Sequence, residues 1–278
     1  KRSLIYAMLG GTCIAAVAMV WTGYTYLLII VLVYFLVQVL INRFRNVDSM
    51  GEFFIVFVML ITAFAVMAPL YWQMNYWGQW FDVPFYLFLG SMLVGGLLMV
   101  SRDYPWTLAI PAVAGIIAIG LVAIFFIAPN IFEAIITGQG YLVKSKLYST
   151  ISEAQAPTFS YLVLSFGAVT FWLALIGIVW AAVKIPKNPS PYLVFVVVWM
   201  AVSIYMAASA SRFMFNASPA FAMSAGWILA LIIGLIKFEE VPRALSGFRS
   251  NPWTTLKKAV KVRHVAVALF LAFLIILP

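Results

Sequence analysis

The chain has 278 residues, of which 65% are hydrophobic and only 9% are charged. Soluble domains are about half apolar and about a quarter charged, so this composition excludes an ordinary soluble protein and predicts a chain that crosses a membrane several times. The net charge of +9 would suit a nucleic-acid partner, but the basic residues are spread over the loops. The single cysteine, Cys13, excludes a disulfide framework.

Nine apolar stretches each approach the length of about 20 residues that a membrane-spanning helix needs. Backbone polar groups in lipid must be paired within their own segment, so these stretches are predicted to be helices. The predicted fold class is all-α, a polytopic membrane helix bundle of about nine transmembrane helices. In chain order we expect the spans near residues 3–21, 25–42, 53–70, 84–100, 107–127, 159–183, 191–209, 218–236 and 264–278.

The basic residues predict which helix ends face the cytoplasm, because cytoplasmic loops carry an excess of lysine and arginine. Assigned to alternate loops, fourteen of the 17 lysines and arginines fall on one side, including the tract 257–263. Only Lys144, Lys146 and Arg212 fall on the other side. We therefore expect a multi-pass membrane protein whose basic tract faces anionic lipid and not nucleic acid.

The longest external connection is the loop 128–158. Loops longer than about 12–15 residues are usually functional or disordered. This loop carries Glu133, Lys144, Lys146 and Glu153 on a side that is otherwise almost free of charge. A carboxylate in such a loop can ligate a hard divalent cation or accept a hydrogen bond from a substrate amide.

Glu153 also has a simpler interpretation. It could be a solvated loop acid, or a charge near the start of the helix expected at Thr158, with Ser152 or Thr150 as the capping residue. One acid cannot form a metal site, and Glu133 is the only other acid in the loop. The spacing alone therefore leaves both interpretations open.

Arg212 lies between two predicted spans at the outer boundary of the membrane. It could extend its guanidinium to the lipid headgroups, as long cationic side chains commonly do. It could instead bind a phosphate, because the planar guanidinium fork matches two phosphate oxygens at once. An outer arginine runs against the charge bias of the chain, which favours a phosphate. Lys144 and Lys146 could assist as point charges, or form a flexible surface pair.

Three motifs together resemble the catalytic subunits of oligosaccharyltransferases. The sequence Trp21-Thr22-Gly23-Tyr24 resembles their Trp-Gly-Gly-Tyr-type motif, and Thr150-Ile151-Ser152-Glu153 resembles the Thr-Ile-x-Glu motif of their long external loop. Arg212-Phe213, followed by Pro219, is similar to the arginine-containing stretch beyond that loop. All three occur in the family's order and on the predicted outer side. The archaeal or bacterial single-subunit form fits best.

The resemblance implies a partial transmembrane domain over residues 1–278, the C-terminal part of a GT-C-type architecture. The family's first external acid, its Asp-x-Asp-type motif and its external Trp-Trp-Asp-Tyr-Gly motif do not occur here. We therefore expect the sequence to be a fragment that lacks N-terminal helices and a C-terminal soluble domain, and to be inactive alone.

The activity implied by the resemblance is protein N-glycosylation, the transfer of an oligosaccharide from a polyprenyl (di)phosphate to Asn in Asn-x-Ser/Thr. Glu153 would contact the acceptor amide and a Mg²⁺ or Mn²⁺ ion, with the other metal ligands outside this sequence. Arg212 would bind the donor phosphate. The partners implied are the lipid-linked oligosaccharide, an acceptor polypeptide and the bilayer. The implied location is the cell membrane of an archaeon or bacterium, with the active site outside.

Two other functions stay open at this point. Another GT-C glycosyltransferase with a polyprenyl-phosphate donor would share the topology, but without this combination of tetrad and outer arginine. A secondary transporter is a third interpretation. Ion-coupled transporters place ionisable groups near the membrane midplane, whereas all eight acids here fall in or beside predicted loops.

Overall fold

The computed structural model describes residues 2–136, 151–234 and 262–276. Within these ranges the chain consists of helices joined by turns and contains no strand, which confirms the predicted all-α fold class. The chain divides into two compact units. Unit 1 comprises Lys1–Gln155 and Pro189–Val202, and unit 2 comprises Ala156–Asn188 and Ser203–Pro278.

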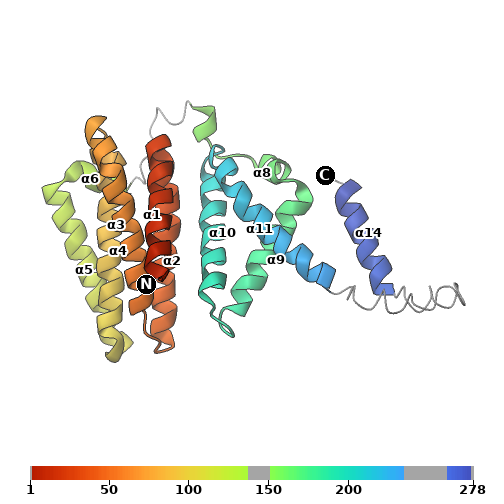
Figure 1. The fold of residues 1–278 in the computed structure, drawn as a ribbon, viewed down its shortest axis with the longest axis horizontal. Coiled ribbons are helices and arrows are strands. Elements are labelled where there is room, and N and C mark those ends of the chain that lie inside the picture. The colour runs from red at the N-terminus through yellow and green to blue at the C-terminus, as the bar shows by residue number, and fades with distance from the viewer. Residues whose placement is uncertain (1, 137–150, 235–261, 277–278) are drawn as a thin grey trace, which may run out of the picture. The chain divides into compact units, whose positions relative to one another are not determined.

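Seven helices in the described ranges are long and apolar enough to cross a membrane, and a bent pair of helices adds an eighth if it forms one span. The predicted count of about nine is not reached there, because α14 (Val262–Ile276) has only 15 residues. The seven are α1 (Arg2–Val20), α2 (Thr25–Phe44), α3 (Met50–Gln73), α4 (Asp82–Val100), α5 (Trp106–Ile127), α10 (Pro191–Ser209) and α11 (Phe213–Gly234), as Figure 1 shows.

The predicted span 159–183 is broken in the structure. Helices α8 (Phe159–Phe166) and α9 (Ala168–Lys184) meet at an angle of 94°. Gly167 between them has a φ of 76°, a conformation that glycine adopts without the steric cost that other residues meet. The break therefore falls at a single glycine within a continuous apolar stretch.

Two further boundaries differ from the prediction. The predicted loop 128–158 begins with a helix, α6 (Pro129–Ile136). Its first residue is a proline, which suits the first helical position because the N–H there needs no partner within the helix. Helix α11 begins at Phe213 and not near residue 218. Pro219 therefore lies inside the helix, a position that membrane helices tolerate.

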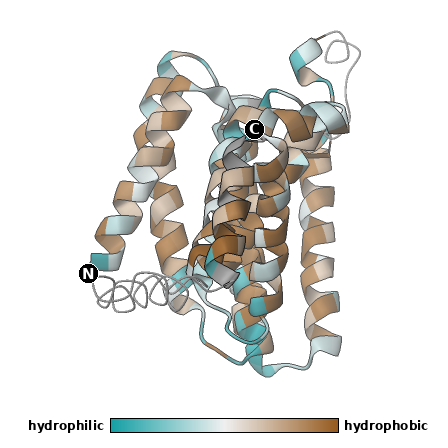
Figure 2. Cartoon of the chain, turned by 90° about the vertical axis from the view of Figure 1, so that its right-hand side faces the viewer, coloured by the Kyte–Doolittle hydropathy of each residue, from teal (hydrophilic) through white to brown (hydrophobic). Residues whose placement is uncertain are grey.

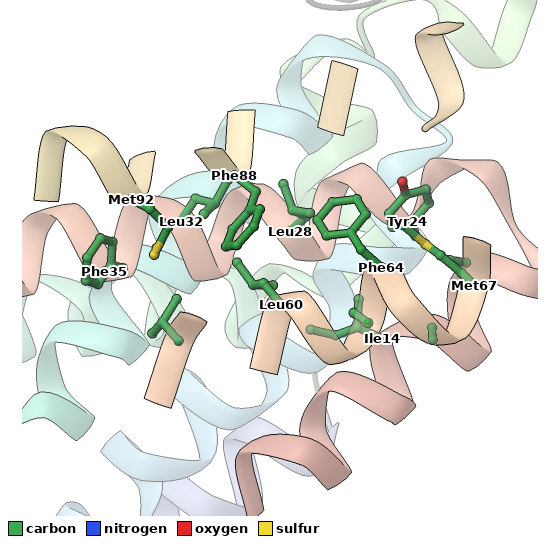
Figure 3. Close-up of a cluster of buried hydrophobic side chains, with 14 of the residues drawn as sticks. Ile14, Tyr24, Leu28, Leu32, Phe35, Leu60, Phe64, Met67, Phe88 and Met92 are labelled. Carbon is green, nitrogen blue, oxygen red and sulfur yellow. The ribbon is translucent and has the colours of Figure 1, made fainter. Parts of the chain in front are cut away.

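The core of unit 1 is an apolar cluster shared by its first four helices. Helix α1 packs against α3, and α2 packs against α4. Figure 3 shows side chains of these helices meeting in a row, with Phe88 beside Leu28 and Leu60. The cluster includes Ile14, Tyr24, Leu28, Leu32, Phe35, Leu60, Phe64, Met67, Phe88 and Met92.

A glycine allows α1 and α3 to approach closely. A Cβ atom on Gly11 would lie 2.1 Å from the carbonyl oxygen of Met59 and 3.0 Å from Cβ of Thr62. Small residues at such crossings are common in membranes, where close packing replaces the hydrophobic effect as the force between helices. Figure 2 shows the matching hydropathy, with brown along the middle of the helices and teal mostly at their ends and turns.

Unit 2 is built on the pair α9 and α11. Gly177 lies against Ser224, whose hydroxyl donates a 2.9 Å hydrogen bond to the carbonyl oxygen of Ala174. The ring of Phe166 stacks on Phe221, with centroids 4.0 Å apart. These contacts tie α11 to α9 and, beside the bend at Gly167, to the end of α8.

Candidate functional site

The tetrad with the candidate catalytic acid lies just before α8. Its first residue, Thr150, is outside the described residues. Ser152–Ala154 form a single 3₁₀ turn, which the N–H of Ala154 closes on the carbonyl of Ile151 at 3.0 Å. Ala154 is buried, whereas the side chains of Ser152 and Glu153 are exposed. The turn is therefore anchored by an alanine and presents a carboxylate to the surroundings.

The capping role considered for Ser152 or Thr150 belongs to another residue. The hydroxyl of Thr158 accepts a 3.3 Å hydrogen bond from the N–H of Tyr161 and so caps α8. Ser152 lies in its own 3₁₀ turn, ahead of the extended Gln155. Glu153 is consequently separated from the helix start, and its place on a short exposed turn leaves it accessible to a ligand.

Arg212 lies in the two-residue turn between α10 and α11. Its guanidinium carbon is 5.5 Å from the ring centroid of Phe213, which is buried. Although the side chain is exposed overall, partial burial lowers the pKa of the Arg212 guanidinium below its ordinary range. An arginine remains protonated at neutral pH after such a shift. The turn therefore offers a permanent positive charge held against an aromatic ring.

The motif at residues 21–24 forms a tight turn between α1 and α2. Tyr24 is fully buried, and its hydroxyl donates to the carbonyl of Trp80 at 2.9 Å. Its ring meets that of Tyr71 edge to face, with centroids 6.2 Å apart. A Cβ on Gly23 would lie 2.1 Å from the ring of Trp21, so any larger residue there would force that ring to move. This geometry suits a structural role for the motif.

The predicted site residues are thus only partly brought together. Ile151, Ser152 and Glu153 share one turn in unit 1, and Arg212 belongs to unit 2. The combination of Glu153 and Arg212 in one site stays a prediction. Lys144 and Lys146 lie outside the described residues.

A divalent cation needs more ligands than this turn provides. Mg²⁺ requires six oxygen ligands in octahedral geometry, usually one or two carboxylates with water and substrate. The described ranges contain no group of three or more His, Cys, Asp or Glu side chains placed to hold a metal. The described residues therefore do not form a complete metal site by themselves.

The sequence analysis missed one group of residues, which surrounds Arg43. This arginine was assigned only to a cytoplasmic loop, but the structure buries it, with 5% of its surface exposed. The sequence signal for this burial was the helical period of α2. The buried face of the helix includes Leu28, Leu32, Phe35 and Val39, and Arg43 lies on the same face, four positions after Val39. The apolar face of the helix thus continues onto a charged residue.

No protein-family model matches the chain, and neither does any curated protein. Two solved structures from Archaeoglobus fulgidus do resemble it. One is the oligosaccharyltransferase AglB in complex with an inhibitory peptide and a dolichol-phosphate. The TM-score is 0.69 and the sequence identity is 17%, and the match covers 98% of this chain and 33% of the AglB chain. The second is that organism's oligosaccharyltransferase in its apo form, with a TM-score of 0.70 and 15% identity over 96% of this chain and 32% of the other.

The chain spans about a third of the length of these solved structures, and nearly all of it superimposes. At this level of identity the likeness establishes the fold. The chain therefore has the fold of part of an archaeal oligosaccharyltransferase, and the resemblance that its three sequence motifs indicated is confirmed.

Proposed function

We propose that the chain forms part of an oligosaccharyltransferase, which moves an oligosaccharide from a polyprenyl (di)phosphate to the Asn of Asn-x-Ser/Thr. The observation that carries the proposal is the fold match, which extends over almost the whole chain. The tetrad that ends in Glu153 supports it through its resemblance to the family's Thr-Ile-x-Glu motif, and the acid itself lies exposed on a turn. The reaction would take place at the external face of a prokaryotic cell membrane.

The chemistry requires help at the acceptor nitrogen. Transfer forms a bond from the anomeric carbon to the amide nitrogen, breaks the bond from that carbon to the donor phosphate, and releases one amide proton. The amide nitrogen is a poor nucleophile because its lone pair is delocalised into the carbonyl. The carboxylate of Glu153 would accept hydrogen bonds from the amide N–H groups and so hold the nitrogen in position for attack.

Arg212 would act on the donor. The departing phosphate carries negative charge, and a guanidinium binds such oxygens through paired hydrogen bonds. The phosphate-bearing lipid lies at the membrane surface, and the turn before α11 is the end of a predicted span. Because the guanidinium stays charged throughout the neutral pH range, its contribution to donor binding should not change with pH there.

The acceptor peptide and a divalent cation complete the proposal. The connection that follows α6 and includes Glu153 would cover the bound peptide and release the product. Mg²⁺ or Mn²⁺ would help to neutralise the leaving phosphate, with Glu153 as one oxygen ligand and the other ligands outside the described residues.

The test of Glu153 uses the protein at its natural length, a lipid-linked oligosaccharide and a fluorescent Asn-x-Thr peptide. Glu153→Gln keeps the size of the side chain and removes its charge, so we expect transfer to fall by about 10²–10⁴-fold. Glu133→Gln is the matched control, because Glu133 is also an exposed acid and lies on helix α6, ahead of the tetrad. Equal turnover in the two variants would remove Glu153 from the site.

The test of Arg212 separates donor from acceptor. A hydrogen bond to a charged group contributes about 1.5–3 kcal/mol, so Arg212→Ala should raise the KM for the donor roughly 10- to 150-fold. The KM for the peptide should stay unchanged. Arg45→Ala, at another exposed helix end, should alter neither value. An effect of Arg212→Ala confined to the peptide would contradict the phosphate role.

A further inference from the structure

The turn that carries Glu153 is held in shape by its own backbone. It is a single 3₁₀ turn with extended backbone on either side. The N–H of Ala154 donates to the carbonyl of Ile151 at 3.0 Å, and the N–H of Gln155 donates to that of Ser152 at 3.2 Å. These two hydrogen bonds fix the shape of the turn, but they do not fix how the turn is rotated on the protein.

One side chain of the turn is buried. Among the described residues 151–161 only Ala154 is buried, with 1% of its surface exposed. Ile151 is 42% exposed, and Glu153 is exposed as well. The methyl group of Ala154 is therefore the one fully packed point of this stretch of chain.

The 3₁₀ geometry links the direction of Ala154 to the direction of Glu153. With three residues per turn, successive side chains point about 120° apart around the axis. When the methyl group of Ala154 points inward, the side chains of Ser152 and Glu153 must point outward, as their exposure shows. The burial of one small residue thus sets the direction of the carboxylate.

The size of residue 154 matters because it is packed on all sides. A side chain with 1% of its surface exposed has no room for further carbon atoms unless its surroundings move. Added methylene groups in a packed position force side chains and backbone to shift. The turn is joined to extended backbone at both ends, so the turn itself is the part that shifts most easily.

We infer that Ala154 is a positioning residue for the carboxylate of Glu153. The inference rests on the proposed function, in which that carboxylate holds the acceptor nitrogen. A displacement of about 1 Å in such an arrangement lowers the rate about 100-fold. The buried methyl group meets neither the peptide nor the lipid donor, so Ala154 acts only through Glu153.

The test makes the same substitution at two neighbouring alanines in the protein at its natural length. Ala154→Leu overfills the buried position, and Ala156→Leu is the matched control because Ala156 is exposed. With a lipid-linked oligosaccharide and an Asn-x-Thr peptide, Ala154→Leu should lower kcat about 10- to 100-fold and leave the KM for the donor unchanged. Ala156→Leu should change neither value. A general loss of structure would also alter the KM for the donor, so the two constants separate positioning from misfolding.

Two smaller substitutions test the position without overfilling it. Ala154→Ser is almost isosteric, and its hydroxyl can bond to the carbonyl of Ile151 one turn earlier, so it should retain most of the activity. Ala154→Gly removes the packed methyl group and frees the backbone, so its kcat should lie between those of Ala154→Ser and Ala154→Leu. Equal kcat values for Ala154→Ser and Ala154→Leu would overturn the inference.

Deuterium exchange tests the anchoring without any reaction. The amides of Ala154 and Gln155 are hydrogen-bonded within the turn, so they should exchange faster in Ala154→Leu than in Ala156→Leu. Equal exchange in these two variants would overturn the inference. If Glu153→Gln lowers transfer and Ala154→Leu does not, the inference falls and the proposed function stands. Normal transfer by Glu153→Gln would overturn the proposed function, and the positioning role would fall with it.

Discussion

The crossing of α1 and α3 gives the sharpest test of the fold. In Gly11→Ala the new methyl group would lie 2.1 Å from the carbonyl oxygen of Met59. An ordinary carbon–oxygen contact is at least about 3.3 Å, so the two helices must separate by roughly 1 Å. The obstacle is backbone, which cannot rotate away as a side chain can.

The magnitude follows from two opposing terms. Overpacking of this kind costs about 1–3 kcal/mol, and the upper part of the range applies where backbone must move. Replacing glycine by alanine inside a helix returns about 1 kcal/mol. Gly11→Ala should therefore lower the free energy of unfolding by about 1–2 kcal/mol. Gly90→Ala, where nothing lies within 4 Å of the new atom, should raise it by up to about 1 kcal/mol.

The assay is equilibrium unfolding in mixed micelles with rising sodium dodecyl sulfate, followed by tryptophan fluorescence. Gly10→Ala is a second control in the same helix, because its new methyl would meet only the flexible side chain of Met59, at 3.2 Å. Its stability should fall between those of the other two variants. A Gly11→Ala variant as stable as Gly90→Ala would refute the close crossing.

Three further predictions concern single contacts. Tyr71→Phe removes the 3.0 Å hydrogen bond to the carbonyl of Ala18 and should cost about 1 kcal/mol of unfolding free energy in the same assay; an unchanged value would mean that the bond is not formed. Thr158→Ala removes the cap of α8, so the amide of Tyr161 should exchange with deuterium faster, and an unchanged rate would assign the cap elsewhere. Gly177→Ala places a methyl group 2.4 Å from the hydroxyl of Ser224 and should lower the thermal stability. Gly226→Ala adds its methyl in open space and should not lower it. Equal thermal unfolding midpoints for the two variants would contradict the packing of α9 on α11.

The spans were predictable because the physical requirement on them is simple. A membrane helix needs about 20 apolar residues with all backbone groups paired, and the composition shows where that condition holds. The span expected at 84–100 is α4, Asp82–Val100, and the one expected at 191–209 is α10. Charge and turn residues mark these ends directly in the sequence.

The bend at Gly167 was not predictable in the same way. The apolar composition continues through it, and most glycines of the part of the chain that the structure describes lie inside helices. Gly90 and Gly115 are examples, at positions where nothing else approaches. Only the backbone conformation at Gly167 distinguishes it from them. Helix breaks of this kind depend on packing with other segments, which a hydropathy pattern does not contain.

The candidate site was predictable from motifs and only partly from physics. The order of the three motifs indicated the fold that the solved structures confirm, although the sequence identity to them is only 15–17%. The exposure of Glu153 on its own turn agrees with a loop acid of either kind. Arg43 was missed because a charged residue beside a turn was expected to be exposed to water. The helical period of α2 instead places it on the buried face of the helix.

The central claim is that the acceptor atom is an asparagine nitrogen. The most direct measurement incubates the protein at its natural length with a polyprenyl-phosphate-linked oligosaccharide and two peptides, one containing Asn-x-Thr and one containing Gln-x-Thr, and locates the added sugar by mass spectrometry. The account predicts a glycan on the Asn of the first peptide and none on the second. Sugar on the hydroxyl of Ser or Thr, or on a lipid, would contradict it and indicate another glycosyltransferase of the same architecture.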